Sequence, residues 1–93
     1  MRTIERSTAF KRDYKRESKG RHRATLEKEL IALLTALAND VPLEPRYRDH
    51  DLSGDWAGYR DCHLRPDLVL IYRKPDATTL RLARLGSHSE VFG

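Results

Sequence analysis

The chain has 93 residues, of which 39% are hydrophobic and 34% charged, and its net charge is +4. This length supports one small domain, residues 1–93, and no apolar run approaches the roughly 20 residues that a membrane-spanning helix needs. Met1 to Gly20 is too polar for a signal peptide and the single cysteine, Cys62, cannot form an internal disulfide, so we expect a cytoplasmic protein with no membrane partner.

The positive charge is concentrated in residues 1–23, which hold nine lysines and arginines against three acidic residues. A basic segment of this kind favours binding to a polyanion, and nucleic acid is the first candidate. A solvated helix face that keeps the protein soluble explains the charge equally well. If RNA or the ribosome is the polyanion, the residues expected to contact it are Lys11, Arg12, Lys15, Arg16, Lys19, Arg21 and Arg23.

Two helices are predicted after a short strand within residues 1–6. Ser7 or Thr8 can cap a helix over residues 8–19, and Gly20 is a natural stop. The second helix has the clearest periodicity in the chain, and Asn39-Asp40 ends it. Its leucines follow the spacing i, i+4, i+7, i+8, i+11 of a buried stripe: Leu26, Leu30, Leu33, Leu34 and Leu37.

Residues 41–58 form a long connection that prolines and glycines interrupt. Such connections are usually either functional or disordered. Tyr47, Leu52 and Trp56 argue against disorder, since each can anchor the connection to a core.

Three strands are predicted next, over residues 59–65, 68–72 and 78–87. Alternation in the first strand places Asp61 and His63 on one face and Cys62 with Leu64 on the other. The alternation blurs at residues 83–85, which suggests a bulge. The order β-α-α-β-β-β predicts an α+β domain, a small, mostly antiparallel sheet with the N-terminal αα-hairpin packed on one face.

Several residues that can transfer protons or bind phosphate lie in the second half of the sequence. If the face with Asp61 and His63 is the helix-free one, it can also gather side chains from the long connection, from the turn after Pro66 and from the last strand. Arg84 and His88, four residues apart, point the same way if that strand stays regular. The additional candidates are His50, Asp67, Arg84 and His88.

This set suits RNA cleavage without a metal ion. A base must take the proton of the ribose 2′-OH, a cation must stabilise the phosphorane, and an acid must protonate the leaving 5′-oxygen. Histidine suits the first and last roles because its pKa lies near neutrality, and arginine can hold two phosphate oxygens at once. Nearby aromatic rings can stack on bases: Tyr47, Trp56 and Phe92.

Plainer explanations exist for each candidate. His50 can simply bond within its loop, Asp67 after a proline is a common turn residue, and Asp61 can pair with Arg60 or Arg84. Trp56 also fits as a core residue. The separations between the histidines and Asp67 match none of the short ligand pairs typical of zinc sites, so we expect no metal and no cofactor.

Four stretches, residues 47–52, 54–63, 66–72 and 84–89 followed by Phe92, resemble the YafQ branch of the RelE/ParE superfamily of bacterial type II toxins. The resemblance implies a RelE-like microbial RNase-type fold and an endoribonuclease that cleaves mRNA in the ribosomal A site, inhibiting translation and growth. It implies the catalytic residues His50, His63, Asp67, Arg84 and His88, with Phe92 placing a base. His88 would protonate the leaving oxygen and Arg84 would hold the phosphate, while the choice of His63 or Asp67 as base stays open.

The resemblance also implies partners. We expect a cognate antitoxin with a ribbon-helix-helix DNA-binding domain, and contact with operator DNA only through the complex. The apolar excess of the second helix makes it the expected docking face for the antitoxin, at Ile31, Ala32, Ala36 and Ala38. Two alternatives remain: a non-catalytic inhibitor of the same fold directed at gyrase, although such relatives lack this set of His, Asp and Arg, and a plain nucleic-acid-binding module.

Overall fold

The computed structural model describes residues 1–93 and contains one five-stranded mixed sheet in the order β1-β5-β4-β3-β2. β1 runs parallel to β5, and all other neighbouring strands are antiparallel. The strands are β1 (Thr3–Arg6), β2 (His50–Asp51), β3 (Arg60–Arg65), β4 (Leu68–Asp76) and β5 (Thr79–Gly86). The helices are α1 (Thr8–Glu17), α2 (Leu26–Ala38) and α3 (His88–Phe92), with 3₁₀ turns η1 (Pro45–Tyr47) and η2 (Gly54–Trp56).

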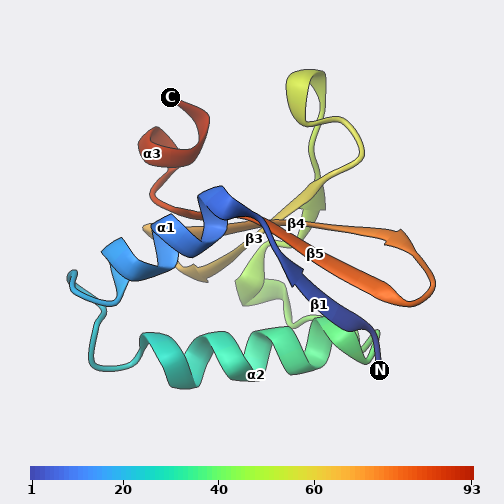
Figure 1. Ribbon diagram of the computed structural model, residues 1–93, viewed down its shortest axis with the longest axis horizontal. Helices are drawn as coiled ribbons and strands as arrows, with labels where there is room; N and C mark the ends of the chain where they lie inside the picture. Colours follow the sequence, from blue (N-terminus) through green and yellow to red (C-terminus); the bar gives the residue numbers. More distant parts are fainter.

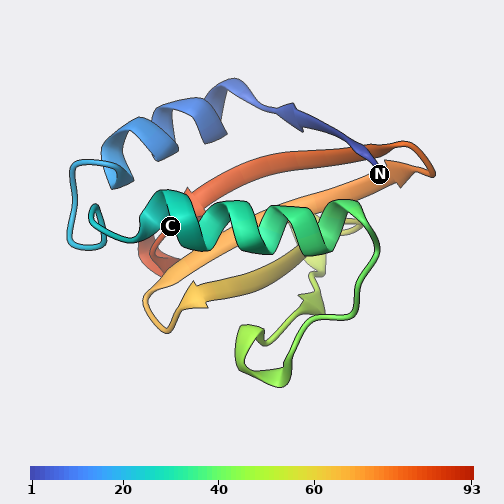
Figure 2. The same ribbon diagram turned by 90° about the horizontal axis from the view of Figure 1, so that it is seen from below.

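The predicted α+β class and the order of the main elements are confirmed, and two short elements are added, β2 and α3. Figure 1 shows α2 below the sheet, with α3 and the β2–β3 connection on the opposite side. Figure 2 looks onto the face that α2 crosses, with α1 beside β1 and β5. None of the helices is both long and apolar enough to span a bilayer.

The main core lies between the helices α1 and α2 and one face of the sheet. The predicted leucine stripe is buried at Leu26, Leu30, Leu33 and Leu37. Burying one such side chain contributes roughly 1.5–3 kcal/mol. The stripe packs against side chains from three strands: Cys62, Leu64, Leu68, Leu70, Tyr72, Leu80, Leu82 and Leu85.

α1 begins where the sequence predicts and ends earlier. The hydroxyl of Ser7 accepts a hydrogen bond from the N–H of Phe10 (2.9 Å), which satisfies a free donor of the first turn. The helix ends at Glu17 and a series of turns through residues 18–25 leads to α2.

The opposite face of the sheet is not bare, contrary to the expectation of an open face. Val69, Ile71, Ala83 and Val91 form a second, smaller cluster, with Leu52, Trp56 and Tyr59 packed against it. α3 brings Val91 to this cluster. The helix starts with a capping box, in which Ser87 Oγ accepts from the Glu90 N–H and the Glu90 carboxylate accepts from the Ser87 N–H.

The predicted bulge in β5 lies at Ala83. Ile71 pairs with Arg84 and Tyr72 with Leu82, so Ala83 is an extra residue on β5. The insertion explains how Leu82 and Leu85 both reach the main core while Ala83 faces the second cluster.

Candidate active site

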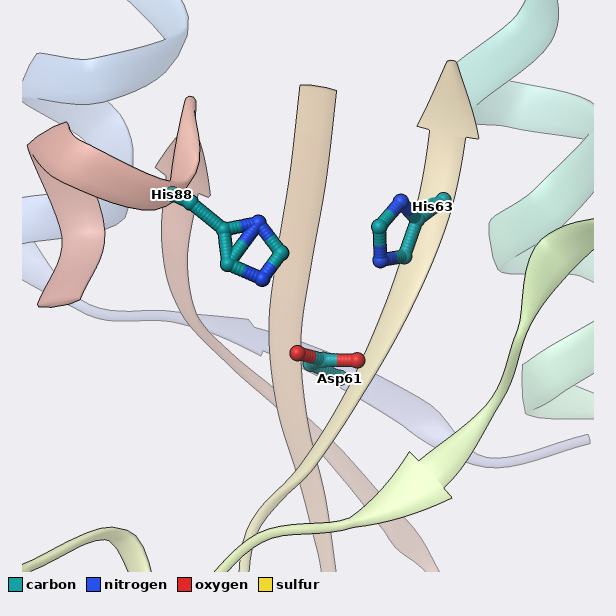
Figure 3. Close-up of side chains that lie close together, drawn as sticks. All are labelled: Asp61, His63 and His88. Atoms are coloured by element: carbon teal, nitrogen blue, oxygen red, sulfur yellow. The ribbon is translucent and has the colours of Figure 1, made fainter. Parts of the chain in front are cut away.

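Three elements bring His50, Asp61, His63 and His88 together. His50 on β2 lies directly opposite Asp61 on β3, and His63 lies two residues further along β3. α3 supplies His88, whose ring centroid is 5.4 Å from that of His63. Figure 3 shows Asp61, His63 and His88 turned toward one another across β4. One side-chain ligand atom from each of these three lies within 4.8 Å of the other two.

The imidazole of His50 is oriented by a backbone carbonyl. Its Nδ1 lies 2.7 Å from the oxygen of Arg48 and 3.1 Å from Asp61 Oδ1. A carbonyl can only accept, so Nδ1 carries a proton. In the neutral ring, Nε2 is therefore the unprotonated nitrogen and is available to take a proton.

Asp61 and His63 are unusually buried for polar residues, with 1% and 9% of their surfaces exposed. Burial raises the pKa of the Asp61 carboxyl, against the opposing effect of His50, His63 and His88. Asp61 Oδ1 is near His50 Nδ1 but accepts no hydrogen bond, because that N–H is directed at the Arg48 carbonyl, and His63 Nδ1 has no partner. Unpaired buried polar atoms are rare and call for a ligand or a functional explanation.

Among the predicted aromatic residues, Phe92 alone adjoins the cluster. Its ring centroid lies 5.3 Å from that of His88, and the side chain is half-exposed. Trp56 packs edge-on against Tyr59 at 5.2 Å, beside the second cluster. Tyr47 packs against the main core.

Arg84 shares a face of the sheet with Asp61, because both pair with Ile71 on β4, but its guanidinium is held by other residues. Its Nε donates to Asp13 Oδ2 (2.7 Å), and its Nη2 donates to Asp13 Oδ1 and to the carbonyl of Glu90 (both 3.3 Å). The guanidinium is thus shared between α1 and α3. The condition of a regular strand between Arg84 and His88 is not met, because the bulge shifts the alternation of β5 and His88 begins a helix.

Asp67 lies on the turn between β3 and β4 and is bound by a different set of residues. Its two oxygens accept from His22 Nε2 and Arg21 Nη1, each at 2.9 Å. The hydrogen bond from His22, aided by that from Arg21, lowers the pKa of the Asp67 carboxyl. These contacts tie the turn to the connection between α1 and α2.

Asp61 pairs with neither Arg60 nor Arg84, which corrects another expectation. Arg60 instead donates to Asp49 and Asp51. Asp49 also accepts from the hydroxyl of Tyr72 (2.5 Å). This network fixes the start of β2 to the sheet and so helps to place His50.

The seven basic residues predicted to contact RNA divide into two groups. Arg16 pairs with Asp13, Glu17 and Glu90, and Arg21 pairs with Asp67. The others are exposed: Lys11, Arg12, Lys15, Lys19 and Arg23.

The cluster also has the donor chemistry of a metal site, which sequence spacing did not suggest. Imidazole nitrogen and carboxylate oxygen are ordinary ligands of zinc and copper. The set is Asp61, His63 and His88, drawn from β3 and α3 rather than from one short motif.

Other proteins with this sequence pattern are known. The family described as bacterial toxin of type II toxin-antitoxin system, YafQ, matches residues 2–93. The mRNA interferase toxin YafQ of Escherichia coli strain K12 is 41% identical over 93 residues, which span 100% of this chain and 98% of that protein.

Solved structures agree with this match. A chain of the E. coli DinJ-YafQ complex is 40% identical with a TM-score of 0.84, covering 100% of both chains. A metal-bound toxin from Helicobacter pylori is 43% identical with a TM-score of 0.82, covering 99% of this chain and 100% of that one. The chain therefore belongs to the YafQ family of toxins of bacterial type II toxin–antitoxin systems.

Proposed function

We propose that the chain is an endoribonuclease that cleaves mRNA in the ribosomal A site, with no metal ion, by attack of a ribose 2′-OH on the adjacent phosphorus. The observation that carries the proposal is the cluster of His50, Asp61, His63 and His88, with two imidazoles 5.4 Å apart. The mRNA interferase activity named for the E. coli relative supports it.

The two sides of the cluster suit the two proton transfers. His50 and His63 on β2 and β3 can accept the proton of the 2′-OH, and His88 on α3 can donate to the 5′-oxygen. A positioned base or acid typically contributes about 10²–10⁴-fold each. Asp61, 3.1 Å from His50 Nδ1, can stabilise the imidazolium that forms when Nε2 takes the proton.

The contacts of Asp67 favour His63 over Asp67 as the base. A carboxylate that accepts from His22 and Arg21 holds its proton even more weakly than usual. We assign Asp67 the role of anchoring the turn that follows β3.

One guanidinium nitrogen of Arg84 is free to bind a phosphate. Asp13 and the Glu90 carbonyl engage Nε and Nη2, which leaves Nη1 to meet an oxygen. Phe92, half-exposed beside His88, is the aromatic residue placed to stack on a base.

The partners follow from the same proposal. The exposed cations of α1 would dock on ribosomal RNA, and a cytoplasmic antitoxin of ribbon-helix-helix type would cover α2, where Ile31 is 57% exposed. Operator DNA would be bound only through that complex. The DinJ-YafQ structure supports an antitoxin partner.

Translation of a defined mRNA in a purified ribosome system tests the reaction. The native chain should produce 5′ ends within the A-site codon by primer extension, and His88→Ala should produce none. His22→Ala is the matched control, because His22 is the one histidine outside the cluster. Arrest of translation without cuts would favour the non-catalytic inhibitor instead.

A second function of the cluster is the binding of a metal ion. The three converging ligand atoms favour it, as does the metal-bound state named for the H. pylori relative. A metal on His63 and His88 would occupy the lone pairs that proton transfer requires. Cleavage by a chain stripped of metal with EDTA and dialysed before it meets the ribosomes should therefore match that of the untreated chain, and it should fall on addition of Zn²⁺ or Cu²⁺. Loss of cleavage by the stripped chain, restored by adding the metal back, would refute the metal-free reaction.

A further inference from the structure

A hollow of about 380 Å³ lies beside the cluster at the end of β3. Of the clustered residues, His63 alone borders it. Its lining is strongly basic, with three arginines against one carboxylate: Glu29, Arg46, Arg48, His63, Leu64, Arg65 and Pro66.

Two of the three arginines are already engaged. Arg65 pairs with Glu29 at 2.6 Å and also donates to Thr25, so the single acidic group of the lining is neutralised. Arg46 pairs with Glu44 at 3.3 Å and lies over the ring of Tyr47.

Arg48 is the remaining cation, and its backbone is unusual. Its side chain is exposed and makes no hydrogen bond or ion pair within the chain. Its φ and ψ are 50° and 40°, a left-handed conformation that is unfavourable for any residue with a Cβ. Such conformations persist where surrounding contacts over-determine them, often at functional sites.

Arg48 is also coupled to the cluster through its main chain. Its carbonyl accepts the Nδ1–H of His50, and its N–H donates to the carbonyl of Pro45. One residue therefore orients a catalytic imidazole with its backbone and offers a free guanidinium to the hollow next to His63.

We infer that this hollow is a phosphate subsite for the mRNA strand, and that Arg48 binds the backbone phosphate next to the one that is cleaved. The inference rests on the proposed ribonuclease function. Arginine suits the role because its planar fork can donate twice to one phosphate, and phosphate contacts fix the register of a strand without selecting its sequence. Arg84, shared between α1 and α3, is less free to do this.

The test measures binding rather than cleavage, so it does not depend on the reaction. Ribosomes carry an mRNA whose A-site codon has 2′-O-methyl riboses, which cannot attack phosphorus, and a second preparation has no mRNA. The variants are Arg48→Gly, which suits the positive φ and keeps the carbonyl, Arg48→Lys, and the control Arg6→Ala, which removes an exposed arginine outside the hollow.

Arg48→Gly should bind the mRNA-loaded ribosomes about tenfold more weakly, the effect of losing one charged hydrogen-bonding group. Its affinity for ribosomes without mRNA should not change, and Arg48→Lys should recover part of the loss. Arg6→Ala should bind as the native chain does. The ¹⁵N shift of His50 Nδ1 should be native-like in Arg48→Gly, which separates the phosphate contact from any disturbance of the imidazole.

Native affinity of Arg48→Gly for the mRNA-loaded ribosomes would overturn the subsite. An equal loss on ribosomes without mRNA would also overturn it, because Arg48 would then contact ribosomal RNA. The proposed function is tested separately: if it is wrong, the native chain will make no cuts in unmodified mRNA.

Discussion

Asp61 is a carboxylate in a position that disfavours its charge. It is 1% exposed, its Oδ1 has no hydrogen-bond partner, and burial raises its pKa. Alternation in β3 predicts that Asp61 and His63 share a face, and that prediction is confirmed. Their burial was not predicted, because it depends on β2 and α3, which contain too few residues to show periodicity.

Replacing Asp61 by Asn should stabilise the fold and impair the reaction. The pKa of Asp61 in the folded chain lies above its unfolded value near 3.8, so ionisation costs stability at pH values above the folded pKa. The cost disappears as pH falls through the folded pKa toward the unfolded value. The gain from Asn should therefore be larger at pH 8 than at pH 4.5, at about 1 kcal/mol.

Urea unfolding at pH 8 and pH 4.5 checks this expectation, with the exposed Asp55→Asn as the control. Cleavage by Asp61→Asn should fall at least tenfold, because the imidazolium of His50 loses its counter-charge. A variant less stable than the native chain at pH 8 would show that the carboxylate makes a favourable contact.

At the scale of elements, α3 carries His88 and is held by a polar network. Asp13 on α1 is completely buried and accepts from Arg84, from Arg16 and from the N–H of Leu85. Arg84 and Arg16 in turn contact Glu90 on α3. The Ser87-x-x-Glu90 capping box was visible in the sequence and is the signal from which α3 could have been predicted.

Asp13→Asn should loosen α3 and destabilise the fold by about 2–3 kcal/mol, somewhat below the cost of breaking a fully buried ion pair because the arginines are partly exposed. Burial would raise the pKa of Asp13, but the hydrogen bonds from Arg84 and Leu85 lower it overall. Its contribution is therefore present above the unfolded pKa and lost as pH falls through the folded pKa.

The difference in unfolding free energy between Asp13→Asn and the native chain should accordingly be full at pH 7 and shrink in acid. Glu27→Gln, exposed on α2 and without an ion pair, is the control and should cost under about 0.5 kcal/mol. A constant difference at all pH values would mean that the charge of Asp13 contributes nothing.

For the molecule as a whole, the sequence predicted the elements that have periodicity. The leucines of α2 and the alternation of β3 repeat over enough residues to define a buried face. The contacts of Arg84 and Asp67 could not be predicted because each depends on a local event: the bulge at Ala83, and the hydrogen bonds that Asp67 accepts from Arg21 and His22.

The positive charge of the molecule is unevenly placed, and part of it lies along α1. Lys11, Lys15 and Lys19, spaced four residues apart along α1 and the turn after it, are exposed and form no ion pair. Replacing all three by Gln should weaken binding to ribosomes at least tenfold at low salt and flatten its salt dependence, because fewer counterions are released.

The free energy of unfolding of this triple variant should change by less than about 0.5 kcal/mol, since the three lysine side chains are exposed to solvent. A variant that replaces Arg6, Lys28 and Arg73 by Gln has the same net charge and serves as the control. If both triple variants lose affinity equally, net charge alone attracts the chain to the ribosome. If only the α1 variant does, this face makes specific contact with ribosomal RNA, and the cluster on the other side of the sheet is presented to the mRNA.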